Sequence, residues 1–419
     1  MLDIKFIKEN TEKVKTALKN KGFGVDIEEL IAKDEERRTL QQEIEKLRSQ
    51  QNAISAKIKD NPELLEQAKA IKQDLKAKEE RFLGVEAEFI KTFQSLPNIP
   101  LDDVPVGQDE TGNKIIKTWG KIPIFKFPVK DHAELGISLD LIDIERAAKV
   151  SGARFTYLKN EIALLEFALS KLAFDVLLKE KFIPIIPPIL IREEMMKAMG
   201  YVDTAADLAE RYYLDKDNLF LIGTAEQSIG PMHAGEIFNE KELPKRYVAF
   251  SSCLREESGS YGKDTKGIFR LHQFDKMEMF SFVKPEDSAK EHLFLLKLEE
   301  KMMQALKIPY RVVHLCTGDM ARPSASTHDI EAWIPSQNRY RETHSVSNCT
   351  DFQARRLNIR YKDSRTGKTE FVHMLNGTAF AMIRTMIAII ENYQRKDGKI
   401  DVPKVLQKYL GFKIIPKKK

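Results

Sequence analysis

The sequence predicts an α+β protein in which a mainly antiparallel β-sheet backed by helices follows an antiparallel coiled-coil arm. Apolar residues keep a spacing of three to four over residues 26–96, with a single break, which indicates two paired helices. Farther along, strand-like segments follow one another without a helix between every pair, which is typical of an antiparallel sheet. We therefore expect an arm over residues 1–100 and an α+β domain over residues 101–419.

The composition predicts a soluble cytoplasmic protein. The three cysteines, Cys253, Cys316 and Cys349, are odd in number and far apart, so neither a disulfide framework nor a cysteine-rich zinc site is expected. The start "MLDIKFIKEN" is too charged for a signal peptide, and no apolar run reaches the ~18 residues of a membrane span. A net charge of +5 fits an anionic partner without requiring one.

The arm is predicted from two heptad-like runs separated by "DNPE" at residues 60–63. At 1.5 Å per residue, each helix would be roughly 45–50 Å long. The apolar seam is narrow, because it is interrupted by Lys33, Arg37, Gln51 and Lys78. A structural spacer or a dimerisation stalk explains such a hairpin as well as a binding arm does.

Near the predicted tip of the arm, basic residues outnumber acidic ones. The bases are Lys46, Arg48, Lys57, Lys59, Lys69, Lys72, Lys76 and Lys78, against Asp60, Glu63, Glu66 and Asp74. A basic tip can bind a phosphate backbone. A solvated lysine-rich helix remains an open alternative.

A linker rich in Pro, Gly and Asn, "LPNIPLDDVPVGQDETGN", separates the arm from the second domain. There, "EIALLEFALSKLAFDVLLKE" predicts a helix, and the prolines of "FIPIIPPIL" predict an extended segment. Strands are expected over residues 219–222, 246–257, 267–280 and 310–315. The segment 371–394 should begin extended and become a helix after the Asn-Gly pair.

One predicted strand carries chemistry on alternate residues. In "GIFRLHQFDKMEMF", residues 267–280, one face presents Arg270, Phe274 and Glu278. Its expected partner strand brings Arg255 and Glu257 to the same cleft. The chain has no glycine-rich phosphate loop, so guanidinium groups would have to bind any phosphate, which they do through two parallel charged hydrogen bonds.

These residues favour a nucleotide site only as a set. Phe274 can stack on a base, Glu278 can bind an amine, and Arg255 can bind a phosphate. Arg384 lies in an apolar helix, where a charge requires a partner. Taken singly, Phe274 also fits core packing, and each arginine also fits a structural ion pair.

Several long segments, in order along nearly the whole chain, resemble the class II aminoacyl-tRNA synthetases in their bacterial-type seryl form. "LREESGSYGKDTKGIFRLHQFDKMEMF" resembles motif 2, and "GTAEQSIGPMHAGEIF" resembles the segment that binds serine. Motif 1 is similar to "VSGARFTYLKNEIALLEFAL" with "FIPIIPPIL", and the end region and motif 3 are similar to "SNCTDFQARRLNIRY" and "LNGTAFAMIRTMIAIIENYQRKDGKIDVPKVLQKYLGF".

The resemblance implies roles for individual residues. Serine would be bound by Thr224, Ala225, Glu226, Glu278, Asn376 and Thr378. ATP would be bound by Arg255, Glu256, Glu257, Phe274, Glu342, Thr343, His344, Ser345 and Arg384. Within this set, Arg255 and Arg384 would be the catalytic residues, on the α- and γ-phosphates, Phe274 would stack on adenine, and Glu342 would bind Mg²⁺. The sequence departs from the family pattern at Lys181, Lys263, His344 and Ile383.

The implied activity is that of an ATP-dependent ligase with L-serine and the serine tRNA as partners. The serine carboxylate attacks the α-phosphorus, and the 3′ end of tRNA then accepts the seryl group. Whether the tRNA for selenocysteine is also charged is left open by the sequence. A catalytically silent tRNA-binding relative is disfavoured because Arg255, Glu278 and Arg384 are all present. A structural coiled-coil protein does not explain the residues after the arm.

A homodimer is expected from the helix predicted over residues 161–180. Its apolar residues cover more of its surface than one sheet face readily buries. The proline-rich segment beside it suits a sheet edge or an interface, because proline donates no ladder hydrogen bond. In the resembled family these two elements form the dimer contact. A helix buried within its own domain is the alternative.

Overall fold

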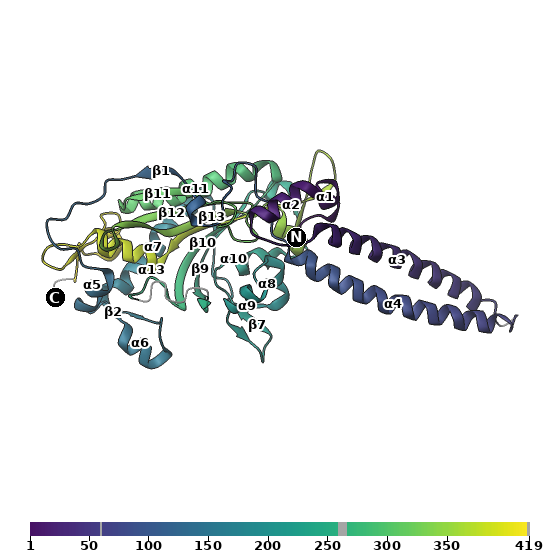
Figure 1. The fold of residues 1–419 in the computed structure, drawn as a ribbon. Helices are drawn as coiled ribbons and strands as arrows, with labels where there is room; N and C mark the ends of the chain where they lie inside the picture. Colours follow the sequence, from purple (N-terminus) through teal and green to yellow (C-terminus); the bar gives the residue numbers. More distant parts are fainter. Residues whose placement is uncertain (59–60, 259–265, 417–419) are drawn as a thin grey trace. The chain divides into compact units, whose positions relative to one another are not determined.

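A computed structural model describes residues 1–58, 61–258 and 266–416 of the 419-residue chain. The chain divides into two compact units, Met1–Ile99 and Pro100–Lys419 (Figure 1). The sequence positions Lys59, Asp60 and Lys263 and the basic tail lie outside the described residues. No helix within the described ranges is long and apolar enough to cross a membrane.

The first unit is helical. Two long helices, α3 (Ile27–Ser55) and α4 (Leu64–Ser95), run antiparallel as the expected hairpin (Figure 1). Two shorter helices that the sequence analysis did not predict precede them, α1 (Ile4–Glu9) and α2 (Thr11–Asn20). Asp26 caps α3 by accepting a hydrogen bond from the Glu29 amide at 3.0 Å, as expected for an acidic N-cap residue.

The polar residues that interrupt the hairpin seam connect its two helices. Lys33 bonds Glu88 at 2.7 Å, and Lys78 bonds Glu43 at 2.8 Å. These pairs alternate with buried apolar residues of both helices, among them Leu40, Ile44, Leu75 and Phe89. The hairpin is therefore held by a narrow apolar seam flanked by ion pairs.

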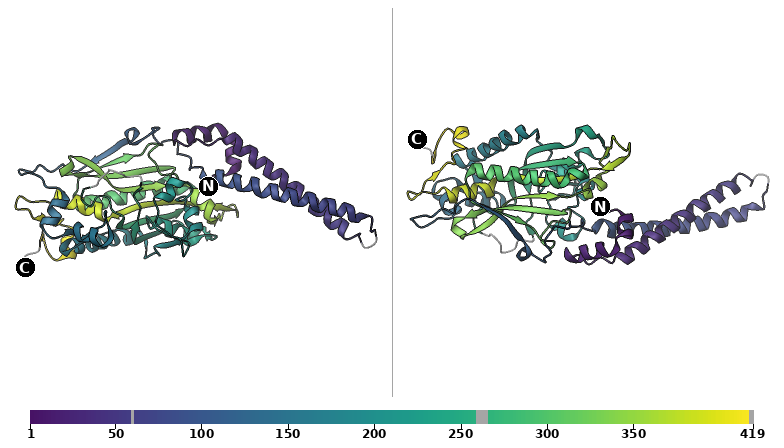
Figure 2. Two further views of the ribbon diagram at one scale, coloured as in Figure 1. Left: turned by 60° about the horizontal axis from the view of Figure 1, so that its bottom comes forward. Right: turned by 90° about the horizontal axis from the view of Figure 1, so that it is seen from above.

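The second unit is built on an eight-stranded sheet in the order β1-β11-β12-β13-β16-β10-β9-β4. Figure 2 shows the ribbon of this unit from two further sides. Every neighbouring pair is antiparallel except β4 and β9, which are parallel. The strands are β1 (Lys114–Trp119), β4 (Ile183–Ile185), β9 (Lys245–Leu254), β10 (Gln273–Val283), β11 (Tyr310–His314), β12 (Ser326–Ile334), β13 (Arg339–Asn348) and β16 (His373–Ala381).

Three helices pack against one face of this sheet: α7 (Asn160–Leu177), α11 (Ser288–Leu306) and α13 (Met382–Asn392). Alternation along β10 separates the two faces. Met277 and Met279 are fully buried in the core with these helices, whereas Lys276 and Glu278 point to the opposite face. The face opposite these three helices is thus the one that carries the charged residues.

Smaller elements complete this unit. The helices are α5 (His132–Ser138), α6 (Ile144–Ser151), α8 (Glu193–Met199), α9 (Ala205–Ala209), α10 (Glu226–Ile229), α12 (Phe352–Leu357) and α14 (Gln407–Leu410). The short strands are β2 (Ile142–Asp143), β3 (Tyr157–Leu158), β5 (Leu190–Arg192), β6 (Tyr213–Leu214), β7 (Leu219–Leu221), β8 (Ile237–Asn239), β14 (Arg360–Lys362), β15 (Thr369–Phe371), β17 (Ile400–Asp401) and β18 (Ile414–Ile415).

Several predicted boundaries were wrong. Strand β9 ends at Leu254 and β10 begins only at Gln273, so Arg255, Glu257 and Arg270 lie beyond the strand ends. Glu257 has φ 53°, which rules out the strand face expected for it. The Asn-Gly pair lies inside β16, and the following helix begins at Met382. Tertiary pairing with β10 overrides the turn propensity of Asn-Gly here.

The predicted edge position of "FIPIIPPIL" is confirmed, because β4 is an outer strand of the sheet. The same region explains one departure from the family pattern. Lys181 has φ 64°, a left-handed conformation that glycine adopts with less strain. The backbone there keeps the shape that suits the glycine common in the family.

Two β-bulges lie in neighbouring strands. Between β12 and β13 the register shifts so that Thr343 is the extra residue of β13. Between β10 and β16 it shifts so that Ala379 is the extra residue of β16. A bulge changes which residues share a face. Each bulge therefore brings residues three positions apart onto one side of the sheet.

Candidate functional site

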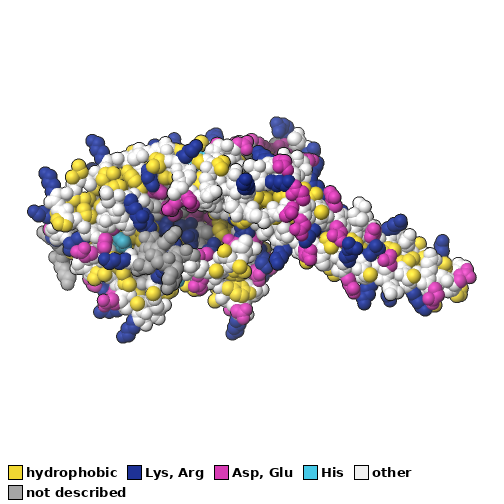
Figure 3. Space-filling view, in the orientation of Figure 1, with side chains coloured by type: hydrophobic (Ala, Val, Ile, Leu, Met, Phe, Trp, Pro, Cys, Tyr) yellow, Lys and Arg dark blue, Asp and Glu magenta, His cyan; other side chains and the backbone are white. Residues whose placement is uncertain are grey.

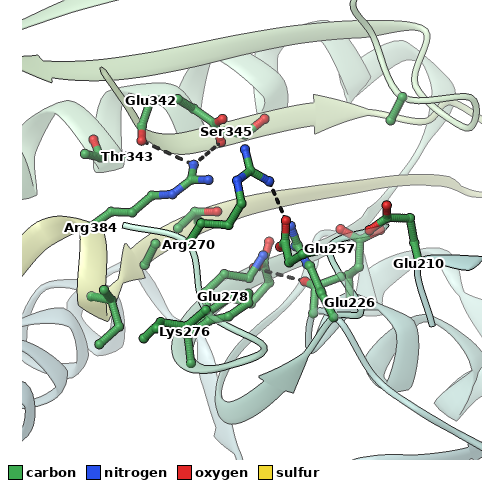
Figure 4. A pocket seen from close by; sticks show the side chains of 18 of the residues that line it. Glu210, Glu226, Glu257, Arg270, Lys276, Glu278, Glu342, Thr343, Ser345 and Arg384 are labelled. Carbon is green, nitrogen blue, oxygen red and sulfur yellow. Dashed lines mark hydrogen bonds and ion pairs between the residues drawn. The ribbon is translucent and has the colours of Figure 1, made fainter. Parts of the chain in front are cut away.

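A cavity of about 590 Å³ lies on the face of the sheet opposite α7, α11 and α13. Twelve of the fifteen predicted site residues line it, namely Thr224, Glu226, Arg255, Glu257, Phe274, Glu278, Glu342, Thr343, Ser345, Asn376, Thr378 and Arg384. Figure 4 shows how the charged members of this set converge. Residues from β10, β13, β16, the start of α13 and the segment after β9 therefore meet in one place.

Three predicted residues do not line the cavity. Ala225 is fully buried in an apolar cluster, and Glu256 is half-buried, with its amide donating to the Glu210 carbonyl at 3.2 Å. The His344 ring packs edge-on against Phe380, with centroids 5.8 Å apart. Burial lowers the pKa of His344 to about 4, so the ring is neutral. A neutral ring away from the cavity does not fit a direct role in binding phosphate.

One end of the cavity is small, acidic and buried. The Thr224 hydroxyl donates to the Glu278 carboxylate at 3.3 Å, and Glu278 is 1% exposed. Lys276 forms an ion pair with Glu278 across the cavity floor (Figure 4). Glu226 is the first residue of α10. Burial, with the nearby charge of Glu278, raises the pKa of Glu226 to about 7.

Strand β16 adds two neutral polar groups to this end. Asn376 and Thr378 lie two residues apart on one face of β16, and both are at least nine-tenths buried. Thr378 is paired in the sheet with Glu278. Together with Thr224 and Glu226, they form a pocket with several hydrogen-bonding groups. Such a pocket suits a small ligand that carries an ammonium and a hydroxyl group.

The other end of the cavity is built around guanidinium groups. Arg255 donates from Nε and Nη2 to the Gly223 carbonyl, at 3.1 and 3.0 Å. Its guanidinium carbon lies 5.2 Å from the centre of the Phe274 ring. Arg270 forms an ion pair with Glu257 (Figure 4). These contacts fix the orientation of both arginines before any ligand binds.

Arg384 and Glu342 form the upper wall of the cavity. Arg384 Nη1 lies 3.0 Å from a Glu342 carboxylate oxygen and also donates to the Glu342 carbonyl at 3.2 Å (Figure 4). Burial would raise the pKa of Glu342, but the charge and hydrogen bond of Arg384 outweigh this effect and lower it. The carboxylate is therefore an anion, and its side chain is 47% exposed.

The bulge at Thr343 explains how Glu342 and Ser345 come to share the cavity. Three residues apart, they would point to opposite faces of a regular strand. With Thr343 as the extra residue, both reach the cavity wall. The sequence alone could not show this, because a bulge depends on the pairing of β13 with β12.

Sequence reasoning assigned no role to four residues that line the cavity: Tyr201, Glu210, Arg211 and Lys276. Tyr201 donates to Glu226, and the Arg211 guanidinium lies 5.4 Å from the Tyr201 ring. Lys276 was detectable, because it alternates with Phe274 and Glu278 along β10. Tyr201 and Arg211 carried no local signal, since only the tertiary fold brings them to the cavity.

Two family models match the chain. The tRNA synthetase class II core domain (G, H, P, S and T) matches residues 212–393. The seryl-tRNA synthetase N-terminal domain matches residues 1–100. The first match spans most of the cavity residues, and the second spans the helical unit.

Full-length relatives agree with these matches. The chain is 44% identical to the serine–tRNA ligase of Dictyoglomus turgidum and 41% identical to that of Nitrosopumilus maritimus, over at least 98% of each chain. Among solved structures, it is similar to the seryl-tRNA synthetase of Pyrococcus horikoshii complexed with ATP, with a TM-score of 0.91, 40% identity and 99% of both chains covered.

A second solved structure is the cytoplasmic serine–tRNA ligase of Naegleria fowleri in complex with AMP. It matches with a TM-score of 0.87 and 33% identity over 100% of this chain and 99% of that chain. Identity at this level over whole chains extends to activity as well as fold. The chain belongs to the seryl-tRNA synthetases and is a serine–tRNA ligase.

Proposed function

We propose that the cavity binds L-serine at its acidic end and ATP at its arginine-rich end, and that the arm of residues 1–100 binds tRNA. One observation carries this proposal: a small pocket of buried polar groups adjoins, within one cavity, a set of oriented guanidinium groups. An amino acid placed in the pocket would direct its carboxylate toward Arg255. The catalytic unit would then be residues 101–419.

Adenylation in this cavity needs positioning more than proton transfer. The serine carboxylate is already an anion, so it can attack the α-phosphorus without a general base. The bond between the α-phosphorus and the bridging oxygen breaks, and pyrophosphate leaves with the electron pair. Arg255 is proposed to hold the α-phosphate and Arg384 the γ-phosphate, which neutralises charge as it develops. Phe274 is proposed to stack on adenine.

Selection of serine is proposed to rest on polar groups that need a hydroxyl partner. Thr224, Glu278 and Thr378 lie around the pocket and are each at most 5% exposed. Alanine and glycine would leave such buried groups unpaired, which gives strong discrimination. Threonine would have to be excluded by its additional methyl group. Size exclusion discriminates more weakly than an unpaired polar group.

The residues at Glu342 fit a magnesium ion bound together with ATP. Mg²⁺ is commonly held by one or two carboxylates plus substrate phosphates. Glu342 supplies an anionic carboxylate, and the Ser345 hydroxyl lies on the same wall. Within the described ranges, no group of three or more His, Cys, Asp or Glu residues could hold a metal without a substrate. When bound, the ion would offset charge on the leaving phosphates.

The arm is proposed to bind the tRNA backbone. Lys57, Lys69 and Lys72 are exposed on α4 or just beyond α3. Lys69 also pairs with Glu66 of its own helix at 2.7 Å, whereas Arg48 and Lys78 pair across the hairpin with Glu79 and Glu43. Acidic and basic side chains alternate along the visible face of the hairpin (Figure 3). Phosphate contacts are therefore expected from the exposed lysines alone.

Assembly as a homodimer is the last part of the proposal. Apolar side chains of α7 and β4 are exposed, with Leu164 at 51%, Phe167 at 68% and Ile183 at 45%. Ile186, just after β4, is 86% exposed. A contiguous exposed apolar patch marks an interaction surface.

The location proposed for the enzyme is the cytoplasm, because its reaction uses ATP and tRNA. Charging of the tRNA for selenocysteine is left to experiment.

The proposal is tested by comparing two reactions of the same protein. We expect serine-dependent exchange of pyrophosphate into ATP, with serine preferred among the twenty amino acids. Deletion of residues 1–99 should leave this exchange near normal and abolish aminoacylation of tRNA. Exchange lost from a deletion that retains its circular dichroism, or charging retained by it, would contradict the assignment of the arm.

A charge substitution separates tRNA binding from folding. Replacement of Lys57, Lys69 and Lys72 by Gln should lower the slope of log K against log salt for tRNA binding, by roughly 0.7–0.9 for each phosphate that is no longer neutralised. Replacement of Lys5, Lys13 and Lys19 by Gln, in α1 and α2 of the same unit, is the matched control. An equal change in slope in the control would show that the effect is not specific to the tip.

A further inference from the structure

A second cavity, of about 1050 Å³, adjoins the first on the same face of the sheet. The two cavities share four wall residues: Phe269, Arg270, Glu342 and Arg384. The second cavity extends from this common wall over β12 and β11 toward β1 (Lys114–Trp119). Apart from the residues of the common wall, no residue of the second cavity has a proposed role in binding serine, ATP or Mg²⁺.

One aromatic ring connects the arginines of the two cavities. The guanidinium carbon of Arg384 lies 5.1 Å from the centre of the Phe269 ring, and that of Arg341 lies 3.9 Å from it. Phe269 is 5% exposed, so its position is fixed by packing. Two cations are therefore held beside one ring, one facing the proposed γ-phosphate position and one facing the second cavity.

A third guanidinium continues this row. Arg341 Nη1 and Arg339 Nε both donate to Oε1 of Gln337, at 2.7 and 3.1 Å. Both arginines line the second cavity. The oxygen that they share is neutral, so this contact orients the two cations without adding a negative charge. The row runs from the common wall into the second cavity in the order Arg384, Arg341, Arg339.

Of the carboxylates that line the second cavity, Glu342 pairs with Arg384 at 3.0 Å, and the others make different contacts. Glu331 forms an ion pair with Arg311 on its own side of the cavity. Asp319 accepts a hydrogen bond from Asn113 at 2.7 Å. Asp329 is buried, with 8% of its surface exposed. Glu110 lies at the exposed rim.

We propose that the second cavity is the exit path for pyrophosphate, with Arg341 and Arg339 as its binding residues. The proposal rests on the placement of the ATP γ-phosphate at Arg384. When the α-phosphorus–oxygen bond breaks, the leaving group lies against the common wall of the two cavities. Pyrophosphate then moves from Arg384 to Arg341 and on to Arg339. Each of these guanidinium groups can donate paired hydrogen bonds to phosphate oxygens.

The alternative occupant is the single-stranded 3′ end of tRNA. The cavity wall includes Trp333 and Tyr340, whose rings meet edge-on at 5.1 Å, and aromatic rings beside arginines suit stacked bases. Pyrophosphate is favoured because the row of arginines starts at the wall where it is released. The two occupants predict effects on different reactions, so one set of variants distinguishes them.

The test measures the Michaelis constant for pyrophosphate in the exchange reaction of the full-length protein. Arg341→Gln and Arg339→Gln should each raise it about tenfold, because each removes a charge-assisted hydrogen bond to a phosphate oxygen. The constants for serine and ATP should stay within about twofold of the wild-type values. The inhibition constant for pyrophosphate in aminoacylation should rise by the same factor.

Arg365→Gln, an exposed arginine after β14 in the same unit, is the matched control and should change none of these constants. Equal increases for ATP and pyrophosphate would overturn the proposal, because the arginines would then hold the triphosphate itself. Unchanged exchange with loss of aminoacylation would overturn it in favour of tRNA. Arg339 is exposed, so its variant tests the proposal even if Arg341→Gln fails to fold. A wild-type protein without exchange would instead contradict the proposed function.

Discussion

Arg255 lies one residue beyond β9, where the ladder no longer uses its backbone and its side chain turns back over Phe274. Arg255→Ala should reduce exchange activity by about 10²–10³-fold, the usual effect of removing one charge-stabilising donor. The loss is measured from the kinetics of pyrophosphate exchange, and circular dichroism serves as the control for folding. Activity within about tenfold of wild type in a folded variant would remove Arg255 from the mechanism.

Glu226 makes serine binding depend on pH. Its pKa is raised to about 7, mainly by burial, so below pH 7 the carboxyl is increasingly protonated. A neutral carboxyl no longer attracts the serine ammonium. The Michaelis constant for serine should therefore rise as pH falls from 8 to 6, and kcat/KM should report a group titrating near 7.

Glu226→Gln is the control for this profile. It should raise the Michaelis constant for serine above pH 7, where the wild-type carboxyl is charged, and remove the inflection near pH 7. A variant that keeps the inflection would assign it to another group. Tyr201, which donates to Glu226, is left unchanged in this test.

Residue types were easier to predict than residue positions. Arg255, Phe274 and Glu278 were identified because a cation, a ring and a carboxylate are unusual together on strands that pair. His344 was placed with its neighbours in the ATP site, but the fold buries it against Phe380. Burial of one residue in a four-residue segment depends on tertiary pairing, which local sequence does not report.

At the scale of elements, three histidines from α11, β11 and β12 meet in the core. His314 and His328 stack with centroids 4.3 Å apart, and His292 lies 4.9 Å from His328. Burial lowers the pKa of His292 to about 4 and that of His328 to about 3. All three rings are therefore neutral in the folded protein near neutral pH.

This cluster predicts a loss of stability in mild acid. Because the folded pKa values lie below the unfolded value of 6.5, the unfolded chain binds protons first as pH falls. The stability is complete above pH 6.5 and decreases toward pH 4, by an amount on the order of 2 kcal/mol at pH 5 for each of His292 and His328. The free energy of unfolding, measured by urea unfolding at pH 7.5, 6 and 5, tests this expectation. His328→Phe should flatten this dependence, and an equally steep one in that variant would contradict the explanation.

The hairpin helices were predicted from a strong periodic pattern, whereas the helix α11 and the strands β12 and β13 were not predicted. The hairpin helices α3 and α4 have a local apolar repeat, so the sequence analysis recovered them. Strands β12 and β13 were missed, because one face of each carries polar groups of the site or of the histidine cluster. Their alternation is broken further by the bulge at Thr343.

At the scale of the whole molecule, the exposed apolar surface of α7 predicts assembly. Light scattering should give about twice the chain mass of 48.2 kDa. Phe167→Glu places a charge on that surface and should yield a monomer, because burying an unpaired charge is costly. Leu293→Glu, at a 59% exposed position of α11, is the matched control and should remain dimeric. A wild-type monomer with full aminoacylation activity would contradict the dimer.

The two faces of the sheet have a consequence for quality control in the cell. Along β10, one set of alternate residues lies in the core and the other set lies in the cavity. A slip of one residue would exchange Met277 and Met279 with Lys276 and Glu278, which would bury charge against the helices and expose methionine. A mispaired chain is thus too unstable to persist. Proteases would remove it, and the surviving pool of folded molecules would carry its substrate groups on the correct side.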